Sequence, residues 1–566
     1  MTRPKIAPEL AAALTAALPS RLVKRLDAEP ALAEAWTWLP DTVTTDKGEV
    51  VRLSVTESIV TAVVCTCLLG PRCLHVGGVV ALLEPAEEIR AVAPKDPVTP
   101  LADLANHSDS STARRAFAVA AEVIGAGAEA TGAFAQAELL RAIHGCRTAG
   151  QHRLATTATR ILRSVRELRA DKPEFSLEVL AADLREVLAV AWAIGEGEVT
   201  PGLLGAARRD YEPAGNLRLY GVFTEAVVAR SGYGGAVTYL VDEAGRFYTR
   251  ADVAPGDAAR ASGAYEASAG LGDAVLPHRE LGRAGLFVSD ATASADGRLG
   301  AGQRVRAVRA TEASRWDRLD WAVPIATQID RIAAHDATPD AQRPAGWDLM
   351  FVEGEIVGPV PAGVAFTVDG AIVTLTTTLD HRLLPARDNL RVLGRGGGVR
   401  ARAIGRARLA AAHRLDLLAI GPLDGEERLV LPETWQGRAN VAFDRLGVPA
   451  PGPRPPLAAL PEAPADDLLV ALRRRIERVV QGGLGTLPTH ALAELEREAG
   501  ALAACALGGG AQALRDLGAV AHAATRAMSG ARRTIDRPAF ARAWLRAALY
   551  EDAARRTLSV ARWTSR

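Results

Sequence analysis

The sequence is poor in several residue types that mark specialised proteins. Aromatic residues make up only 5% of its 566 residues, and the chain has five lysines and five cysteines. Lysine and arginine number 67 against 66 aspartates and glutamates, so the formal charge is +1 and bulk charge does not make this protein a binder of polyanions. So few cysteines in so long a chain do not form a disulfide framework. Any strongly basic surface is therefore local.

Long hydrophobic runs are also lacking. The longest apolar stretch without a charge, Ala499 to Leu514, has 16 residues, fewer than the roughly 18 that indicate a membrane span. The N-terminal segment MTRPKIAPELAAALTAALPSR looks like a signal peptide at first sight. However, Glu9 interrupts its apolar part and Arg21 follows it at once. We therefore expect an amphipathic helix here and a cytoplasmic protein.

What the chain does contain is ordinary globular sequence, with 48% hydrophobic and 23% charged residues. A length of 566 residues predicts about three or four domains. We expect an α+β multidomain protein with this organisation: N-terminal helices plus a small strand–strand–helix module (1–100, module core 48–84), a helical bundle (101–200), a β-rich domain (201–345), a second β-rich domain (346–448), a proline-rich linker (449–465) and a helical C-terminal domain (466–566).

Local patterns support these boundaries. The stretch from Pro8 to Trp38 has helical periodicity with a break at Pro19. Residues 50–64 are rich in β-branched side chains and predict a hairpin that turns at residues 56–58. The proline-rich, charged segment after Leu83 predicts a linker, and apolar spacings of three and four predict three or four helices from Ala113 to Gly195.

The middle of the chain alternates like β-structure. A hairpin turning at residues 242–245 is expected in the first β-rich stretch, and another turn at Asp296–Gly297. Asp369–Gly370 gives the clearest two-residue hairpin signal in the chain. Both stretches run strand, Glu, strand, Gly-containing link, strand, turn, strand, so we suspect a divergent duplication of one small β unit.

The most informative feature is the segment CTCLLGPRCLH, which contains Cys65, Cys67, Cys73 and His75. Two thiols at i and i+2 at a strand end point to the same side, and Gly70–Pro71 supplies a turn that returns the chain. A helix starting near Cys73 then brings the third thiol and the imidazole to the first pair. Four such ligands predict a closed tetrahedral Cys3His zinc site, which is structural rather than catalytic.

The alternative is that these cysteines are small buried hydrophobes and that His75 lies on the surface. Three of the five cysteines and one of the ten histidines fall within eleven residues, and a random distribution of these residues explains such clustering poorly. We therefore favour one structural Zn²⁺.

This spacing resembles the SWIM zinc finger, whose hallmark is Cys-x-Cys followed after a variable gap by Cys-x-His on a strand–strand–helix framework. The resemblance covers roughly residues 48–84. Many family members carry a basic residue between the last Cys and His, where this chain has Leu74, with Arg72 just before Cys73. A partner contact made by that basic residue would have moved to Arg72 or been lost.

Other candidate sites are weaker. We find no Gly-x-Ser-x-Gly, His-Glu-x-x-His or suitable Ser-x-x-Lys motif. We expect His278 to be an exposed or capping residue, and Cys146 and Cys505 to be buried structural thiols. The glycine-rich segment from Gly394 lacks the lysine and hydroxyl of a P-loop and is expected to be a flexible turn.

Two regions are locally basic. Arg141 to Arg169 carries seven arginines against one acidic residue, and the helical C-terminal region 467–566 carries sixteen against nine. A solvated helical face is the expected explanation, because no aromatics are interleaved for base stacking. If nucleic acid binds, the candidate contacts are Arg72, Arg147, Arg153 and Arg160.

We expect a non-enzymatic zinc-binding adaptor or recognition protein that makes protein–protein contacts. Bacterial SWIM proteins of similar build look like members of gene neighbourhoods with a MoxR-type AAA+ ATPase and a von Willebrand factor A protein. The resemblance thus implies a partner or substrate selector of an ATP-driven remodelling machine.

Two alternatives remain open. The first is nucleic-acid binding through the finger and the basic helices. The second is an enzyme with an unrecognised site near Glu225, Asp242, Glu353 or Glu355, although these carboxylates are better explained as strand and turn residues.

Overall fold

The computed structural model forms two compact units, Met1–Pro100 and Leu101–Arg566. It describes residues 3–6, 10–11, 14, 17–19, 21–22, 25–26, 29, 32–56, 59–67, 69–83, 109–206, 211–230, 232–302, 304–310, 316, 319–339, 342–453, 469–523 and 535–564. The linker expected after Leu83 lies outside these residues, as does most of the linker at 449–465. None of the described helices is both long and apolar enough to cross a bilayer.

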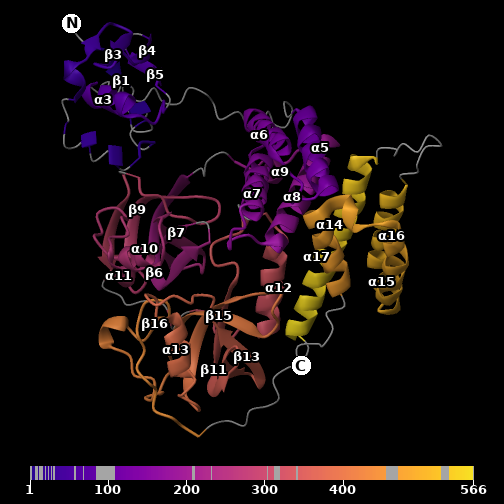
Figure 1. Ribbon diagram of the computed structural model, residues 1–566. Coiled ribbons are helices and arrows are strands. Elements are labelled where there is room, and N and C mark those ends of the chain that lie inside the picture. Colours follow the sequence, from indigo (N-terminus) through magenta and orange to yellow (C-terminus); the bar gives the residue numbers. More distant parts are fainter. Residues whose placement is uncertain are drawn as a thin grey trace. The chain divides into compact units, whose positions relative to one another are not determined.

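The first unit is built on a small sheet of five described strands, in the order β1-β5-β4-β3-β2. Its elements are β1 (Lys5–Ile6), the 3-10 helix η1 (Leu32–Ala35), β2 (Thr37–Trp38), β3 (Thr42–Thr44), β4 (Val50–Thr56), β5 (Ile59–Cys65) and the helix α3 (Leu74–Leu82). Strand β1 runs parallel to β5, and the remaining neighbours are antiparallel. The predicted strand–strand–helix order is therefore present as β4, β5 and α3, inside a larger sheet than expected (Figure 1).

The helical prediction for the N-terminal segment is wrong at its end. Residues 32–35 form a 3-10 turn, and Thr37 and Trp38 pair with β3 as an edge strand. Trp36 points into the core, where its ring lies against α3, and the Trp38 indole donates a hydrogen bond to the Ala33 carbonyl at 2.8 Å. Packing these two indoles stabilises this fold by more than continuing the helix that the periodicity predicts.

Helix α3 packs closely because it carries two glycines. A Cβ at Gly77 would lie 2.6 Å from a methyl carbon of Leu26, and one at Gly78 would lie 3.1 Å from the Trp36 ring. Larger residues would push the helix away from Leu26 and from the 3-10 turn with its following Trp36. The glycines thus allow α3, whose first turn carries His75, to pack closely against Leu26 and the Trp36 ring.

The helices of the second unit form one body although they come from both ends of its sequence. They are α5 (Ser110–Ala126), α6 (Ala133–Thr148), α7 (His152–Arg169), α8 (Leu177–Gly195), α9 (Pro201–Leu204), α14 (Val470–Gly482), η5 (Gly483–Thr486), η6 (Thr489–Ala491), α15 (Leu492–Ala504), α16 (Gly508–His522) and α17 (Arg537–Thr564). Buried residues of 113–204 and 469–548 belong to a single hydrophobic core. The two helical segments, expected as separate domains, therefore pack side by side (Figure 1).

The first β-rich segment forms a barrel-like sheet in the order β10-β9-β6-β7-β8. Its elements are β6 (Glu212–Ala229), β7 (Tyr233–Val241), β8 (Phe247–Pro255), α10 (Ala258–Glu266), α11 (His278–Leu281), β9 (Gly285–Ala293) and β10 (Arg306–Ala310). Arg298 and Leu299 lie between β8 and β9: Thr249 pairs with Arg298 in parallel, and Ala293 pairs with Leu299. The predicted turns at 242–245 and 296–297 are confirmed.

The second β-rich segment closes into a barrel. Its elements are α12 (Ile325–Asp336), β11 (Leu349–Val360), β12 (Gly363–Val368), β13 (Ala371–Thr376), α13 (Ala386–Leu393), β14 (Arg400–Ala407), β15 (Arg414–Pro422), η4 (Glu433–Trp435) and β16 (Ala439–Asn440). The parallel pairing of β13 with β15 completes the circle β11-β12-β13-β15-β14. The Asp369–Gly370 hairpin is present, with both residues at positive φ.

The two β-rich segments have the same connectivity. In each, three antiparallel strands are followed by helical residues, then by a fourth strand beside the first, and then by residues that lie between the third and fourth strands. Five strands in this order make a small Greek-key barrel of the OB type. The shared topology supports the suspected duplication.

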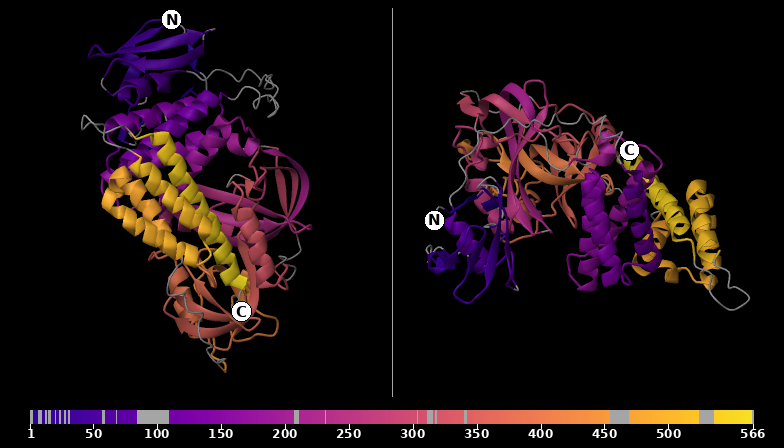
Figure 2. Two further views of the ribbon diagram at one scale, coloured as in Figure 1. Left: turned by 90° about the vertical axis from the view of Figure 1, so that its right-hand side faces the viewer. Right: turned by 90° about the horizontal axis from the view of Figure 1, so that it is seen from above.

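Polar and apolar contacts join the barrels and the helices of the second unit. Arg406 of β14 forms an ion pair with the buried Glu225 of β6 at 2.9 Å, and the Tyr239 hydroxyl also donates to Glu225. The long helix α17 enters the helical core through Trp544 and the core of the second barrel through Trp563. Figure 2 shows α17 running from the helices toward that barrel.

Candidate metal centre

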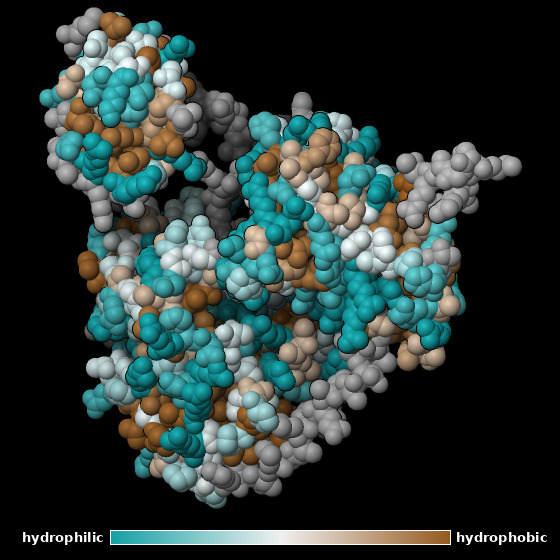
Figure 3. Space-filling model, viewed as in Figure 1, coloured by the Kyte–Doolittle hydropathy of each residue, from teal (hydrophilic) through white to brown (hydrophobic). Residues whose placement is uncertain are grey.

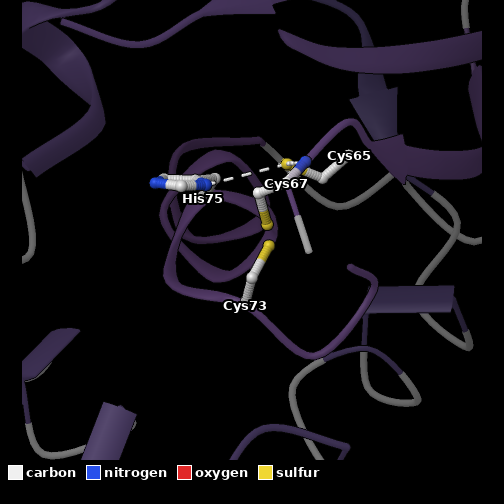
Figure 4. Close-up of side chains that lie close together, drawn as sticks. All are labelled: Cys65, Cys67, Cys73 and His75. Atoms are coloured by element: carbon white, nitrogen blue, oxygen red, sulfur yellow. Dashed lines mark hydrogen bonds between the residues drawn. The ribbon is translucent and has the colours of Figure 1, made fainter. Parts of the chain in front are cut away.

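The four predicted metal ligands come together in the first unit. Cys65 is the last residue of β5, and Cys67 follows in the bend after it. Cys73 is the N-cap of α3, and His75 lies in the first turn of that helix. Their ligand atoms all lie within 4.8 Å of one another (Figure 4). Among the residues that the structure describes, this is the one Cys/His/carboxylate group found with such geometry.

The geometry of this cluster fits a tetrahedral ion. The Cys65 sulfur lies 3.7 Å from Nδ1 of His75. Two ligands of a tetrahedral zinc, at about 2.3 Å for sulfur and 2.0–2.1 Å for nitrogen, are separated by roughly 3.6 Å. Three sulfurs and one imidazole nitrogen are also the donor set of structural zinc sites. The cluster can therefore hold one metal ion such as zinc.

Backbone groups support negative charge on the sulfurs. The Cys67 amide lies 3.5 Å from the Cys65 sulfur, and the Val76 amide donates to the Cys73 sulfur at 3.4 Å. The second contact places a thiol at the N-terminus of α3, where the helix dipole favours an anion. The Cys73 side chain thus caps the helix and belongs to the cluster.

The three thiols differ in acidity in the metal-free cluster. Burial raises the pKa of Cys65 to about 12 and also raises the pKa of Cys73. Burial also acts on Cys67, but hydrogen bonds from the Leu69 amide and with His75 outweigh it and lower the pKa of Cys67 to about 7. Metal binding must displace the protons from all three, so the affinity depends on pH.

Two further side chains contact His75. Nε2 of His75 lies 4.0 Å from Oε2 of Glu49, and the Thr45 hydroxyl donates to the same carboxylate oxygen at 2.5 Å. The Thr45 hydrogen bond, followed by that from the Glu49 amide, lowers the pKa of Glu49. The Trp36 ring meets the imidazole edge-on, with centroids 5.9 Å apart.

Sequence reasoning missed Glu49, Thr45 and Trp36. The register of the predicted hairpin would have indicated Glu49. In the β4–β5 hairpin, Val51 pairs with Cys65, and Val50 and Thr66 exchange hydrogen bonds. Continuing this register by one step places Glu49 opposite Cys67. Nothing local in the sequence indicates the approach of Trp36.

Comparisons with models of protein families, with curated proteins and with solved structures find no match. The Cys3His cluster therefore suggests a zinc-binding site without a family assignment.

The arginines named as candidate nucleic-acid contacts lie in different settings. Arg72 is exposed in the loop between Cys67 and Cys73, and Arg147 is exposed at the end of α6. Arg153 donates to Glu186 at 2.9 Å and to the Gly202 carbonyl.

Arg160 pairs with Asp183 at 2.7 Å and with Glu186 at 3.0 Å. These pairs join α7 to α8, so both Arg153 and Arg160 have a role within the fold. Within the described part of the chain, the arginine found over an aromatic ring of α8 is a different one, Arg542, which lies over Trp192.

Two expectations about isolated residues are wrong. His278 is fully buried, and its Nδ1 lies 2.8 Å from the Thr238 hydroxyl. Burial lowers the pKa of His278 to about 4, so the ring is neutral at pH 7. Cys505 is exposed at the C-cap of α15, because that helix ends at the surface of the helical body. Cys146 is buried as expected.

Three of the remaining candidate carboxylates make contacts within the fold. Asp242 accepts hydrogen bonds from the amides of the 242–246 turn, Glu225 pairs with Arg406, and Glu353 pairs with Arg402 at 2.7 Å. The glycine-rich segment from Gly394 is largely buried, and Gly398 packs against the backbone of residues 452–453.

Proposed function

We propose that this chain is a zinc-binding recognition protein whose N-terminal unit is a SWIM-type finger with a structural zinc ion. The observation that carries the proposal is the convergence of four soft or borderline donors within 4.8 Å on a strand–strand–helix framework. With three cysteines and one histidine as protein ligands, zinc has no open position for substrate. The ion therefore holds the finger together instead of performing chemistry.

The proposed recognition surface is the loop between Cys67 and Cys73. Zinc would clamp this loop at both ends, and its tip presents Leu69, which is 65% exposed, together with the exposed Arg72. Val64, at the end of β5, is 61% exposed and adds a second apolar side chain. Figure 3 shows apolar and hydrophilic residues interspersed on the visible face of this unit. A protein partner that offers an apolar contact and a carboxylate would suit these groups.

The proposed partner system follows the SWIM resemblance. A MoxR-type AAA+ ATPase and a von Willebrand factor A protein would be the partners, and this chain would select substrates for them. The second unit would then be a scaffold for further contacts. Affinity purification of the intact chain from its native cell tests this directly.

The matched variants are Cys67→Ser, which removes a ligand, and Cys505→Ser, which removes an exposed thiol outside the finger. We expect one zinc per wild-type chain and per Cys505→Ser chain by elemental analysis, and none in Cys67→Ser. Wild-type protein and Cys505→Ser should recover the ATPase, and Cys67→Ser should not. Wild-type protein purified without chelator and free of zinc would contradict the proposal.

Nucleic-acid binding is the second candidate, and the barrels rather than the basic helices support it. Arg153 and Arg160 are engaged in ion pairs, whereas OB-type barrels are one of the folds on which oligonucleotides bind. Because fold alone does not establish function, this candidate stands below the first. Binding to single-stranded DNA or RNA that weakens steeply with salt would favour it.

A further inference from the structure

We propose that Glu49 is a positioning residue for the metal centre: its carboxylate accepts a hydrogen bond from Nε2–H of His75 and so directs Nδ1 of that ring to the metal. The inference rests on the proposed zinc site and adds a specific function for a residue outside the four ligands. It concerns how the imidazole is held, not whether a metal binds.

The two nitrogens of His75 face different groups. Nδ1 lies 3.7 Å from the Cys65 sulfur, whereas Nε2 lies 4.0 Å from Oε2 of Glu49. In Figure 4 one ring nitrogen is directed toward the sulfurs and the other away from them. The ring would therefore bind the metal through Nδ1, which leaves Nε2 protonated and free to donate.

Glu49 is held in place by hydrogen bonds with Thr45. The Thr45 hydroxyl donates to Oε2 of Glu49 at 2.5 Å and accepts from the Glu49 amide at 3.1 Å and the Lys47 amide at 3.3 Å. Thr45 is itself buried, at 6% exposure. The carboxylate is thus oriented by the turn between β3 and β4 before any metal binds.

Metal binding would shorten the contact between the ring and the carboxylate. A separation of 4.0 Å is an ion-pair distance rather than a hydrogen bond, and a shift of roughly 1 Å closes it. A cation on Nδ1 withdraws electrons from the ring and makes Nε2–H a stronger donor. Metal-bound histidines usually donate their second nitrogen to a carboxylate, carbonyl or water, and this contact raises ligand basicity.

Trp36 limits how the ring can move. Its indole is 8% exposed and meets the imidazole edge-on at an interplanar angle of 69°. A half-turn about the Cβ–Cγ bond would place Cδ2 instead of Nδ1 beside the sulfurs, so Nε2 could reach them only if the whole ring moved, and that movement would break the contact with Trp36. Packing and the carboxylate therefore favour the same orientation.

The experiment compares zinc affinity in the full-length chain by competition with a chelator. Glu49→Leu removes the acceptor, Glu49→Gln keeps an oxygen acceptor without charge, and Asp46→Asn is the matched control. Asp46 is exposed in the same turn, so its substitution removes an equal charge. We expect zinc affinity to fall about 10- to 100-fold in Glu49→Leu, less in Glu49→Gln, and by less than about twofold in Asp46→Asn.

Nitrogen-15 NMR of histidine-labelled, zinc-loaded protein gives a second readout that a merely structural role would not change. We expect wild-type His75 to be metal-bound through Nδ1 with a proton on Nε2, and the Nε2–H resonance to shift in Glu49→Gln. Each variant should still reach one zinc per chain at saturating zinc, which shows that it folds.

The outcomes separate the two proposals. Wild-type protein without zinc would contradict the proposed function. Zinc-loaded wild-type protein with Nε2 coordination, or Glu49 variants that match Asp46→Asn in affinity, would overturn this inference and leave the zinc finger intact.

Discussion

Several side chains in this protein have two roles that depend on their exact surroundings. The Cys73 sulfur accepts the Val76 amide as a helix cap and belongs to the metal cluster. Arg406 pairs with Glu225 of the first barrel and with Asp348 at 2.5 Å, so one guanidinium balances two carboxylates. Coulombic attraction to Glu225 is the main reason that the pKa of Arg406 is raised. Such residues tolerate substitution poorly, because removal of one partner leaves another buried group unpaired.

His278 should make the first barrel sensitive to acid. Its pKa is about 4 in the fold and 6.5 in the unfolded chain, so as the pH falls the unfolded state takes up the proton first. The stabilisation is therefore complete above pH 6.5 and is lost as the pH falls toward 4. The free energy of unfolding should decrease by up to about 3 kcal/mol over this window. Asp252 opposes the shift, whereas Arg250 and Arg260 reinforce it.

The variant His278→Gln should remove this slope, because an amide keeps a hydrogen bond to Thr238 without titrating. The measurement is the difference in urea stability between about pH 7 and about pH 4.5, followed by hydrogen exchange in β6 and β7. His144→Gln, at an exposed position on α6, is the control. A wild-type slope retained in His278→Gln would show that another group carries the acid sensitivity.

At the level of elements, turn chemistry and helix packing set the architecture. Asp369 and Gly370 both have positive φ, of 50° and 82°, which gives the two-residue turn that matches strand twist. Helix α17 joins two hydrophobic cores, with Trp544 fully buried in one and Trp563 in the other. Its second half is also held by the pair Arg556–Asp336 to α12.

Alanine substitutions of two glycines should change stability in opposite directions. Neither Gly370 nor Gly263 has an atom within 4 Å of an added Cβ, so only the backbone differs. Gly370→Ala forces a side chain into the left-handed region and should cost about 1 kcal/mol. Gly263→Ala lies in helix α10 and should stabilise by about 0.5–1 kcal/mol. Urea unfolding of both variants checks this, and equal signs would contradict it.

At the level of the whole molecule, each of the two units has its own core. The first unit buries a modest cluster that includes two of the candidate ligands, Cys65 and Cys73, whereas the two main clusters of the second unit are much larger. With the proposed zinc bound, this small core would depend on its metal, because binding energy of about 10 kcal/mol or more would become folding energy. Among the described residues of the larger unit, no comparable group of metal ligands is found.

Removal of zinc should therefore unfold only the first unit. After chelation we expect hydrogen exchange to become fast in β3, β4, β5 and α3, while α5–α8 and both barrels keep their protection. Zinc added back should restore the original pattern. Loss of protection throughout the second unit, or none in the first, would show that the metal has a different role.

Much of the metal site is local in sequence and could be predicted. Cys65, Cys67, Cys73 and His75 fall within eleven residues, and strand alternation plus a turn suffices to bring them together. Glu49 and Trp36 could not be placed with equal ease, because their approach requires the hairpin register and the packing of η1 on α3.

The order of helical and β-rich segments after residue 48, the two Asp- and Gly-containing hairpins and the ligand spacing were set by the sequence alone, since each depends on residues a few positions apart. Only tertiary structure decided that helices some 270 residues apart share one core, that β13 and β15 close a barrel, and that His278 is buried. Contacts of this kind depend on how complete surfaces pack, and no short pattern encodes which amphipathic face meets which.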